Sequence, residues 1–384
     1  MAMSSIGRKE YIKEIGKQYK KASKKERGTL LDAAEVITGM HRKYLIMRLR
    51  HSVIRTIPFK GTGRGRRRIY DEYFHDALLV CWHATNNICA ERLQPFMPEL
   101  VAKLENCHEL SVSDNTRSLL LRASVSTVAR HLCRAKRRST VPLGTTKPGS
   151  LLKSQIAVRK GRWQETNPGW LESDTVAHGG DSAAGQFIHS YNFIDIATGW
   201  NEQVASMGKG EKATVAAFNE VRSKFPFRIL GIDSDNGGEY INDHLKRYCE
   251  REGLTFTRSR PYQKNDNAHV EQKNWEAIRK IIGYARLDTE EQLNILNKLY
   301  RKPLHLYLNY FQPTRKRKIE ILDTATGKKR KSYFEAKTPY QRTMEHPAVP
   351  QATKKLLQST YDNLNPVVLL AEIEDLVREL ERLV

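Results

Sequence analysis

Three carboxylates, Asp174, Asp235 and Glu271, are placed where a fold could bring them to one point. Asp174 follows residues 170–173, which are expected to be a first strand, and Asp235 comes just after an apolar strand expected at 228–232. Glu271 opens a helix with polar cap candidates before it. The ends of two strands and the start of a helix can bring these three side chains together, although 61 and 36 positions separate them in the sequence.

Such a cluster suits phosphoryl transfer on DNA, because the attacking and leaving oxygens both gain negative charge near an anionic phosphate. Two divalent ions about 3.5–4 Å apart stabilise both oxygens, and hard oxygen ligands hold Mg²⁺. Taken singly, each carboxylate has an ordinary interpretation, since exposed carboxylates are abundant. Asp235-Asn-Gly-Gly, for example, is also a tight-turn signal. The joint spacing is what favours a metal site.

Four motifs surround the carboxylates between about Trp163 and Tyr310. They are Leu171-Glu-Ser-Asp174-Thr, Phe193-Ile-Asp195-Ile-Ala-Thr-Gly-Trp200, Ser234-Asp235-Asn-Gly-Gly-Glu239 and Arg260-Pro-Tyr-Gln-Lys-Asn-Asp-Asn-Ala-His-Val-Glu271. Thirty-five residues lie between Asp235 and Glu271, which is the spacing of the D,D-35-E signature. This stretch resembles the retroviral-integrase-type catalytic domain found in bacterial insertion-sequence transposases.

The resemblance implies a DNA transposase or integrase with an RNase H-like catalytic core. Asp174, Asp235 and Glu271 match the catalytic metal ligands, whereas the nearby Asp233 would give the wrong spacing. Two Mg²⁺ ions per active site are implied, with Mn²⁺ as the expected substitute and no nucleotide cofactor. Water would cleave DNA at the element's ends to free a 3′ hydroxyl, which would then attack target DNA.

One departure from the resemblance lies on the helix after Glu271. Retroviral relatives carry lysines one and two turns after the glutamate, where this chain has Trp275 and Ile278, both expected on one helix face. The nearby basic residues, displaced around the helix, are Lys273, Arg279 and Lys280. The sequence therefore predicts metal binding here and no particular DNA contact by this helix.

The formal net charge of +22 is unevenly distributed. Residues 1–150 carry a net charge of +16, residues 151–300 are neutral and residues 301–384 carry +6. Basic regions bind nucleic acid by releasing counterions from phosphates, although any single basic run can also be a solvated face. The charge predicts a polyanionic partner, double-stranded DNA, bound mainly by the N-terminal part.

Residues 1–60 are predicted to form a helix-turn-helix DNA-binding domain. Ser23 and Glu26 form a capping box, Leu30, Leu31, Ala34 and Ile37 recur at helical spacing, and Thr38-Gly39 ends the helix. A second helix is expected at about 40–49. An ordinary helical hairpin is the alternative. The candidate DNA-binding residues of this segment are Arg42, Lys43, Tyr44 and Arg48.

Residues 61–69 are predicted to be a basic arm and 70–138 a second helical DNA-binding region. In the arm, the candidate DNA contacts are Arg64, Arg66 and Arg67. In the second region, one helix closes with Leu119 to Leu121, Ser124 and Ser126 are cap candidates for the next, and Arg130 and Arg134 are the candidate DNA contacts. Residues 139–160 are expected to be a linker.

Residues 161–312 are predicted to be the α/β catalytic core, and 313–384 a basic C-terminal module. The core should contain an alternating strand at 186–196, with Phe187, Tyr191 and Phe193 on one side, and short strands at 228–232 and 254–258. Helices are expected at 212–225 and 240–252, the latter ended by Gly253. The C-terminal module should hold a strand pair within 313–331 and a final helix. Its apolar residues, which fit either docking on the same chain or a coiled coil, are Leu369, Ile373, Leu376, Leu380 and Leu383.

Five cysteines without a C-x-x-C pair predict reduced thiols rather than a zinc site. No apolar stretch of membrane-spanning length appears, so we expect a bacterial cytoplasmic protein associated with the nucleoid. We expect the partners to be the element's terminal repeats and target DNA, bound by a homo-oligomer, and no membrane. The alternatives are an RNase H-like nuclease without strand transfer and a DNA-binding regulator with an inactive core.

Overall fold

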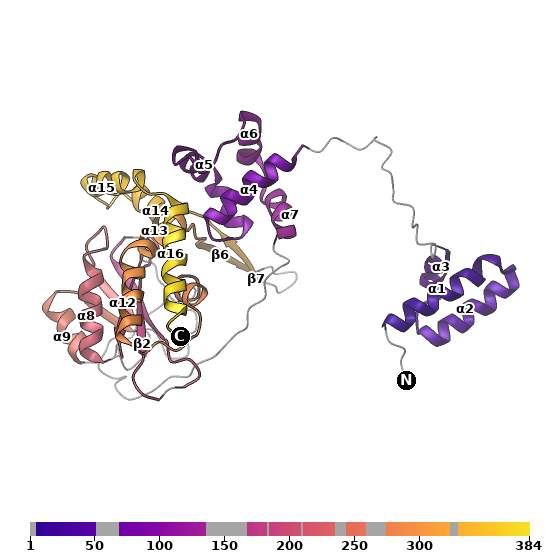
Figure 1. Ribbon diagram of the computed structural model, residues 1–384, viewed down its shortest axis with the longest axis horizontal. Coiled ribbons are helices and arrows are strands. Elements are labelled where there is room, and N and C mark those ends of the chain that lie inside the picture. The colour runs from indigo at the N-terminus through magenta and orange to yellow at the C-terminus, as the bar shows by residue number, and fades with distance from the viewer. Residues whose placement is uncertain are drawn as a thin grey trace. The chain divides into compact units, whose positions relative to one another are not determined.

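The computed structural model of the chain describes residues 5–50, 69–135, 167–182, 184–208, 210–234, 243–258, 274–322 and 329–384 (Figure 1). They fall into two compact units, Met1–Ile69 and Tyr70–Val384. No helix in these ranges is both long and apolar enough to cross a lipid bilayer. The candidate residues outside the described ranges are Asp235, Glu271, Arg64, Arg66 and Arg67, and the predicted linker at 139–160 lies outside them too.

The first unit contains the helices α1 (Ser5–Lys21), α2 (Lys24–Thr38) and α3 (Arg42–Arg50). The predicted capping box of Ser23 and Glu26 starts α2, and Gly39 ends it with φ of 66°. α1 was not predicted, because its core residues Ile12, Ile15 and Tyr19 are interspersed with lysines. Ile37 was expected on the buried face, but it is 43% exposed.

The second unit is built on a mixed sheet of five strands in the order β3-β2-β1-β4-β5. The strands are β1 (Trp170–Ala177), β2 (Ile188–Asp195), β3 (Asn201–Met207), β4 (Gly231–Ser234) and β5 (Thr255–Arg258). β2 runs antiparallel to both β1 and β3, whereas β4 runs parallel to β1 and β5. A mixed α/β sheet was part of the predicted fold class, and it is confirmed.

One strand was missed, and two strand predictions need correction. β3 was not predicted, because its buried Asn201, Glu202 and Gln203 break the apolar pattern. β4 begins three residues after the predicted start of 228–232. β2 was expected to alternate between buried and exposed residues, yet all of its residues are buried because helices cover both of its faces.

The side chains of β2 show which helices cover which face of the sheet. Tyr191 accepts a hydrogen bond from Thr214 of α8 (3.3 Å), and Phe193 contacts Phe218 of the same helix. Ser190 lies on the opposite face, 2.7 Å from the hydroxyl of Tyr300. Two helices lie between strands of the sheet, α8 (Glu211–Arg222) after β3 and α9 (Asp243–Arg251) after β4. The helices after β5 are η2 (Asn274–Arg279), α11 (Lys280–Ile282), α12 (Glu290–Leu299), η3 (Tyr300–Leu304) and α13 (His305–Phe311). Of these, η2 and η3 are π-helices.

Four earlier helices belong to the same compact unit as the sheet. They are α4 (Glu72–Ala84), α5 (Ala90–Asn106), α6 (Asp114–Arg122) and α7 (Val125–Ala135). Tyr307 of α13 donates a hydrogen bond to the carbonyl of Ala84 (2.9 Å), and Ser124 caps α7 as predicted by accepting from the N–H of Thr127 (3.3 Å). The segment predicted to bind DNA is therefore joined by direct contacts to the predicted catalytic core.

The C-terminal part adds a strand pair and three helices. They are β6 (Arg317–Leu322), β7 (Lys329–Tyr333), α14 (Pro339–Glu345), α15 (Gln351–Asp362) and α16 (Pro366–Glu381). α16 lies beside α12 (Figure 1), with Leu369, Ile373 and Leu376 in the core. Docking of the last helix on its own chain is therefore confirmed over a coiled coil.

Candidate active site

Asp174 lies within β1, not at its end. β1 continues to Ala177 because it remains paired with β2, and Asp174 is directly opposite Asn192. Its Oδ1 accepts a hydrogen bond from the backbone N–H of Thr175 (2.7 Å), and its Oδ2 accepts from the amide of Asn274 (2.5 Å). The half-buried carboxylate is thus held by its own strand and by η2.

The end of β4 lies beside Asp174. The parallel pairing of β1 and β4 brings Ser234 opposite Ser173, one residue before Asp174. Asp235 comes next in the sequence and lies outside the described residues. Asp233, the rival candidate, is fully buried, and its Oδ1 accepts a hydrogen bond from the hydroxyl of Thr257 (2.6 Å).

The helix expected after Glu271 is described from Asn274 onward. Glu271 itself is outside the described residues, three positions before Asn274. Trp275 and Ile278 do not share a face as predicted: Ile278 is fully buried and Trp275 is 53% exposed. The physical reason is the π-helix, whose i→i+5 bonding widens the turn so that residues three apart diverge.

The basic residues of this helix contact the protein itself. Arg279 donates to the carbonyl of Ala177 (2.8 Å), and burial lowers the pKa of its guanidinium. Lys280 donates to the carbonyl of Asn86 (2.9 Å), and its pKa is also lowered, first by burial and then by Arg92. Both cations therefore help to hold η2 and α11 in place.

The Asp195–Trp200 motif forms the turn between β2 and β3. Asp195 is fully buried, its Oδ2 accepts from the N–H and the hydroxyl of Thr198, and its Oδ1 accepts from the N–H of Gly169, each at 2.7 Å. Burial raises the pKa of this carboxyl, although the hydrogen bonds oppose the shift. The part of this motif at 195–198 therefore fixes the end of β2 to the start of β1, the strand that carries Asp174.

The candidate DNA-binding residues lie on helices in both units. Arg42 forms ion pairs with Asp32 and Glu35 of α2, while Lys43 and Tyr44 are exposed. Arg130 is exposed on α7, and its Nε donates to the carbonyl of Ser126 (3.2 Å). Arg48 and Arg134 lie on α3 and α7, but their side chains are not described.

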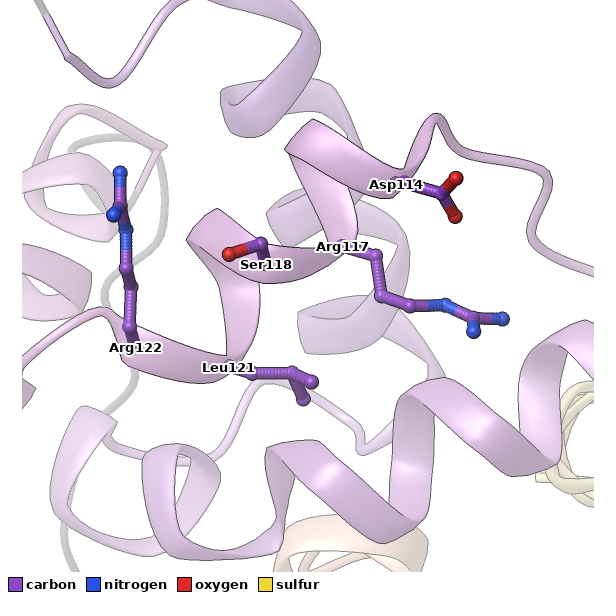
Figure 2. Close-up of a pocket in the computed structure, with 5 residues that line it drawn as sticks. All are labelled: Asp114, Arg117, Ser118, Leu121 and Arg122. Carbon is purple, nitrogen blue, oxygen red and sulfur yellow. The ribbon is translucent and has the colours of Figure 1, made fainter.

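A surface hollow of about 500 Å³ lies along α6 (Figure 2). The residues that line it are Asp114, Arg117, Ser118, Leu121 and Arg122. Arg117 is engaged by Glu105 of α5, to which its Nε donates (3.0 Å). None of the lining residues belongs to the sheet, so this hollow is separate from the Asp174 site.

A buried histidine near the site predicts a pH dependence of stability. The Nε2 of His178 lies 2.8 Å from the Ser190 hydroxyl, and burial lowers the pKa of His178 from 6.5 to about 3. Below pH 6.5 His178 binds a proton in the unfolded state but not in the folded state, so stability should fall as the pH falls toward 3. This titration should lower the stability of the wild type by roughly 1.4 kcal/mol for each pH unit below 6.5. His178→Gln lacks the titrating group, so we expect it to lose less stability than the wild type between pH 7 and 5, as measured by urea denaturation.

The control for this prediction is His83→Gln, which changes an exposed histidine of α4. It should keep the wild-type pH dependence. Equal pH dependence in His178→Gln and the wild type would contradict the prediction.

Comparison with solved structures gives low overall similarity. The HTLV-2 integrase catalytic core, solved with magnesium, shares 14% identity at a TM-score of 0.29, covering 42% of this chain and 93% of its own. The BIV integrase core shares 14% over 45% of this chain and 91% of its own, with a TM-score of 0.30. A chain of the simian T-cell lymphotropic virus intasome, solved in complex with PP2A regulatory subunit B56 gamma, shares 14% identity over 65% of this chain and 76% of its own, with a TM-score of 0.32. These TM-scores are too low to support an argument about the core, which is defined by its own five-stranded sheet.

Sequence comparison is more specific. No protein-family model matches the chain. The uncharacterized protein y4rM of Sinorhizobium fredii is 35% identical over 317 residues, covering 81% of this chain and 88% of that protein. Identity at this level over this much of both sequences means that the chain belongs to the same family as y4rM.

Proposed function

We propose that this chain is a DNA transposase or integrase with a two-metal site formed by Asp174, Asp235 and Glu271. The observation that carries the proposal is the placement of Ser234 and Asn274 beside Asp174. Consecutive Cα atoms are about 3.8 Å apart, so Asp235 starts one such step from Ser234 and Glu271 at most about 11 Å from Asn274. Chain connectivity thus supports a meeting of the three carboxylates.

The donor chemistry of Asp174 fits a divalent ion. A carboxylate oxygen has two lone pairs, so a hydrogen bond to each oxygen of Asp174 is compatible with a metal bond from the same oxygen. Carboxylates are the ligands that Mg²⁺ and Mn²⁺ prefer. Together the three residues would hold two ions, which would supply Lewis-acid stabilisation of the attacking and leaving oxygens.

The proposed reaction has two phosphoryl-transfer steps. In the first, a water oxygen bonds to phosphorus at the element's end while the bond to the 3′ oxygen breaks and frees a 3′ hydroxyl. In the second, that hydroxyl oxygen bonds to a phosphorus of target DNA while a target P–O bond breaks. The contribution of the chain would be to hold the carboxylates of Asp174, Asp235 and Glu271 around the reacting phosphate.

Binding of the element's terminal repeats falls, in this proposal, to the two helical segments, 5–50 and 72–135. The excess of 16 positive charges in residues 1–150 supports this role, because neutralised phosphates release counterions. Lys43, Tyr44 and Arg130 are exposed and available for such contacts. A homo-oligomer acting on DNA in the bacterial cytoplasm is part of the same proposal, since two DNA ends must be handled together.

The test is Mg²⁺-dependent cleavage and joining of DNA carrying the repeats that flank the gene, with Asp235→Asn as the inactive control. Joined products that disappear in the control are the expected result. Cleavage without joining would instead support the nuclease alternative. If the protein binds the repeats but forms no product in Mg²⁺ or Mn²⁺, the result would support the remaining alternative, a DNA-binding regulator with an inactive core.

A further inference from the structure

A row of buried amide side chains leads from Asp174 into the sheet. Asn274 donates to Asp174, and its Oδ1 accepts from the Nδ2 of Asn192 (2.7 Å). The Oδ1 of Asn192 in turn accepts from Asn201 (2.6 Å) and Gln203 (3.2 Å). Asn192, Asn201 and Gln203 are fully buried on β2 and β3. We call Asn274, Asn192, Asn201 and Gln203 the amide relay.

The direction of every bond in the amide relay follows from one backbone carbonyl. Asn201 Nδ2 faces the carbonyl oxygen of Phe193 (3.0 Å), which can only accept, so this side of Asn201 must be its NH₂ group. The same NH₂ faces Asn192, which therefore presents its oxygen to Asn201 and its own NH₂ to Asn274. Asn274 must then present its oxygen to Asn192 and its NH₂ to Asp174.

The amide relay also ties the start of η2 to the strand that carries Asp174. Asp174 and Asn192 are directly paired across β1 and β2, so their side chains lie on the same face of the sheet. The bond from Asn192 fixes Asn274 against that face, and Glu271 precedes Asn274 by three residues. Any shift of Asn274 would therefore move the start of η2 relative to Asp174.

We infer that Asn192 is a positioning residue for the metal site, acting through Asn274 to orient the Asp174 carboxylate and to anchor η2. The inference rests on the proposed function. Groups that hold a metal ligand typically change metal affinity or activity by about 10–100-fold when removed. Asn192 is paired with Asp174 across β1 and β2, and its side chain should act on the Asp174 carboxylate through Asn274.

The test measures binding of Mn²⁺ alone to the full chain, by electron paramagnetic resonance of the free ion. Asn192→Leu keeps the branching at Cγ and the number of side-chain heavy atoms but removes the donor to Asn274. We expect it to weaken Mn²⁺ binding about 10-fold or more. Asn192→Ser is a smaller, polar change whose hydroxyl is too short to reach Asn274. It should also weaken Mn²⁺ binding, and it takes the place of the leucine variant if that variant does not fold.

Asn297→Leu is the matched control. Asn297 is another buried amide, on α12, which accepts from the N–H of Ala205 (2.8 Å) and donates to its carbonyl (3.0 Å). Its loss should lower the melting temperature while Mn²⁺ affinity stays at the wild-type value. Equal weakening of Mn²⁺ binding by Asn297→Leu would mean that Asn192 acts only through stability.

The outcomes for the amide relay and for the proposed function are distinguishable. If the wild type binds Mn²⁺, Asp174→Asn does not, and folded Asn192 variants bind as tightly as the wild type, the amide relay is wrong and the proposed function stands. If the wild type and Asp174→Asn bind Mn²⁺ equally, the metal site itself is wrong, and the inference falls with it.

Discussion

Replacement of Asp174 by asparagine should lower both end cleavage and joining by at least about a thousandfold, which corresponds to roughly 4 kcal/mol of transition-state stabilisation. Asparagine has the same shape but lacks the negative charge that holds a divalent ion. Its side chain also meets the NH₂ group of Asn274 with only one acceptor oxygen. Single-turnover cleavage of repeat DNA in Mg²⁺ measures the effect.

The control for Asp174→Asn is Asp181→Asn. Asp181 is an exposed aspartate shortly after β1, so its substitution removes the same charge from the same part of the chain. We expect wild-type cleavage from it, and a melting temperature for Asp174→Asn close to that of the wild type. A folded Asp174→Asn protein that cleaves at the wild-type rate would exclude Asp174 from the metal site.

Several local elements could be predicted because their signals are short-range. The strand before Asp174, the helix caps at Ser23 and Ser124 and the glycine end at Gly39 each depend on a few neighbouring residues. Asp174 itself was identified through motif spacing. Its position within β1, rather than at the end, depends on how far pairing with β2 extends, and single-strand patterns do not contain that information.

The amide relay was missed for a related reason. Asn192, Asn201 and Gln203 appear in the sequence as polar interruptions, which favour an exposed strand face or a loop. These amides can be buried because each one forms a hydrogen bond with the next, and the hydrogen bonds join β2 to β3 and to η2. The local signal is that Asn192 lies between two apolar residues, Tyr191 and Phe193. The π-helix of η2 left no such signal.

An ion pair between α5 and η2 connects the helical segment to the candidate active site. Arg92 Nη1 lies 2.8 Å from Glu276 Oε1, and the two side chains are 15% and 17% exposed. Arg92 Nε also donates to the carbonyl of Pro313 (2.5 Å). Because Glu276 lies two residues after Asn274, this pair fixes η2 from the side of α5, while the amide relay fixes it from the sheet.

Arg92→Met should therefore be among the most destabilising single changes outside the core. It leaves the Glu276 carboxylate at a largely buried position without its guanidinium, a loss that typically costs about 3–5 kcal/mol. The double variant Arg92→Met/Glu276→Met should recover much of that loss, because a well-packed apolar pair often replaces a buried ion pair at little cost. Urea denaturation of the two single variants and the double variant gives the coupling energy.

The matched control is the ion pair between Arg378 and Asp375 on α16, whose side chains are 62% and 72% exposed. Arg378→Met should cost no more than about 1 kcal/mol, because water screens an exposed pair. If Arg92→Met cost no more than Arg378→Met, the contact between α5 and η2 would be too weak to hold the active-site helix. If instead the double variant regains stability yet cleaves DNA more slowly than the wild type, the ion pair positions η2 for catalysis as well as stabilising it.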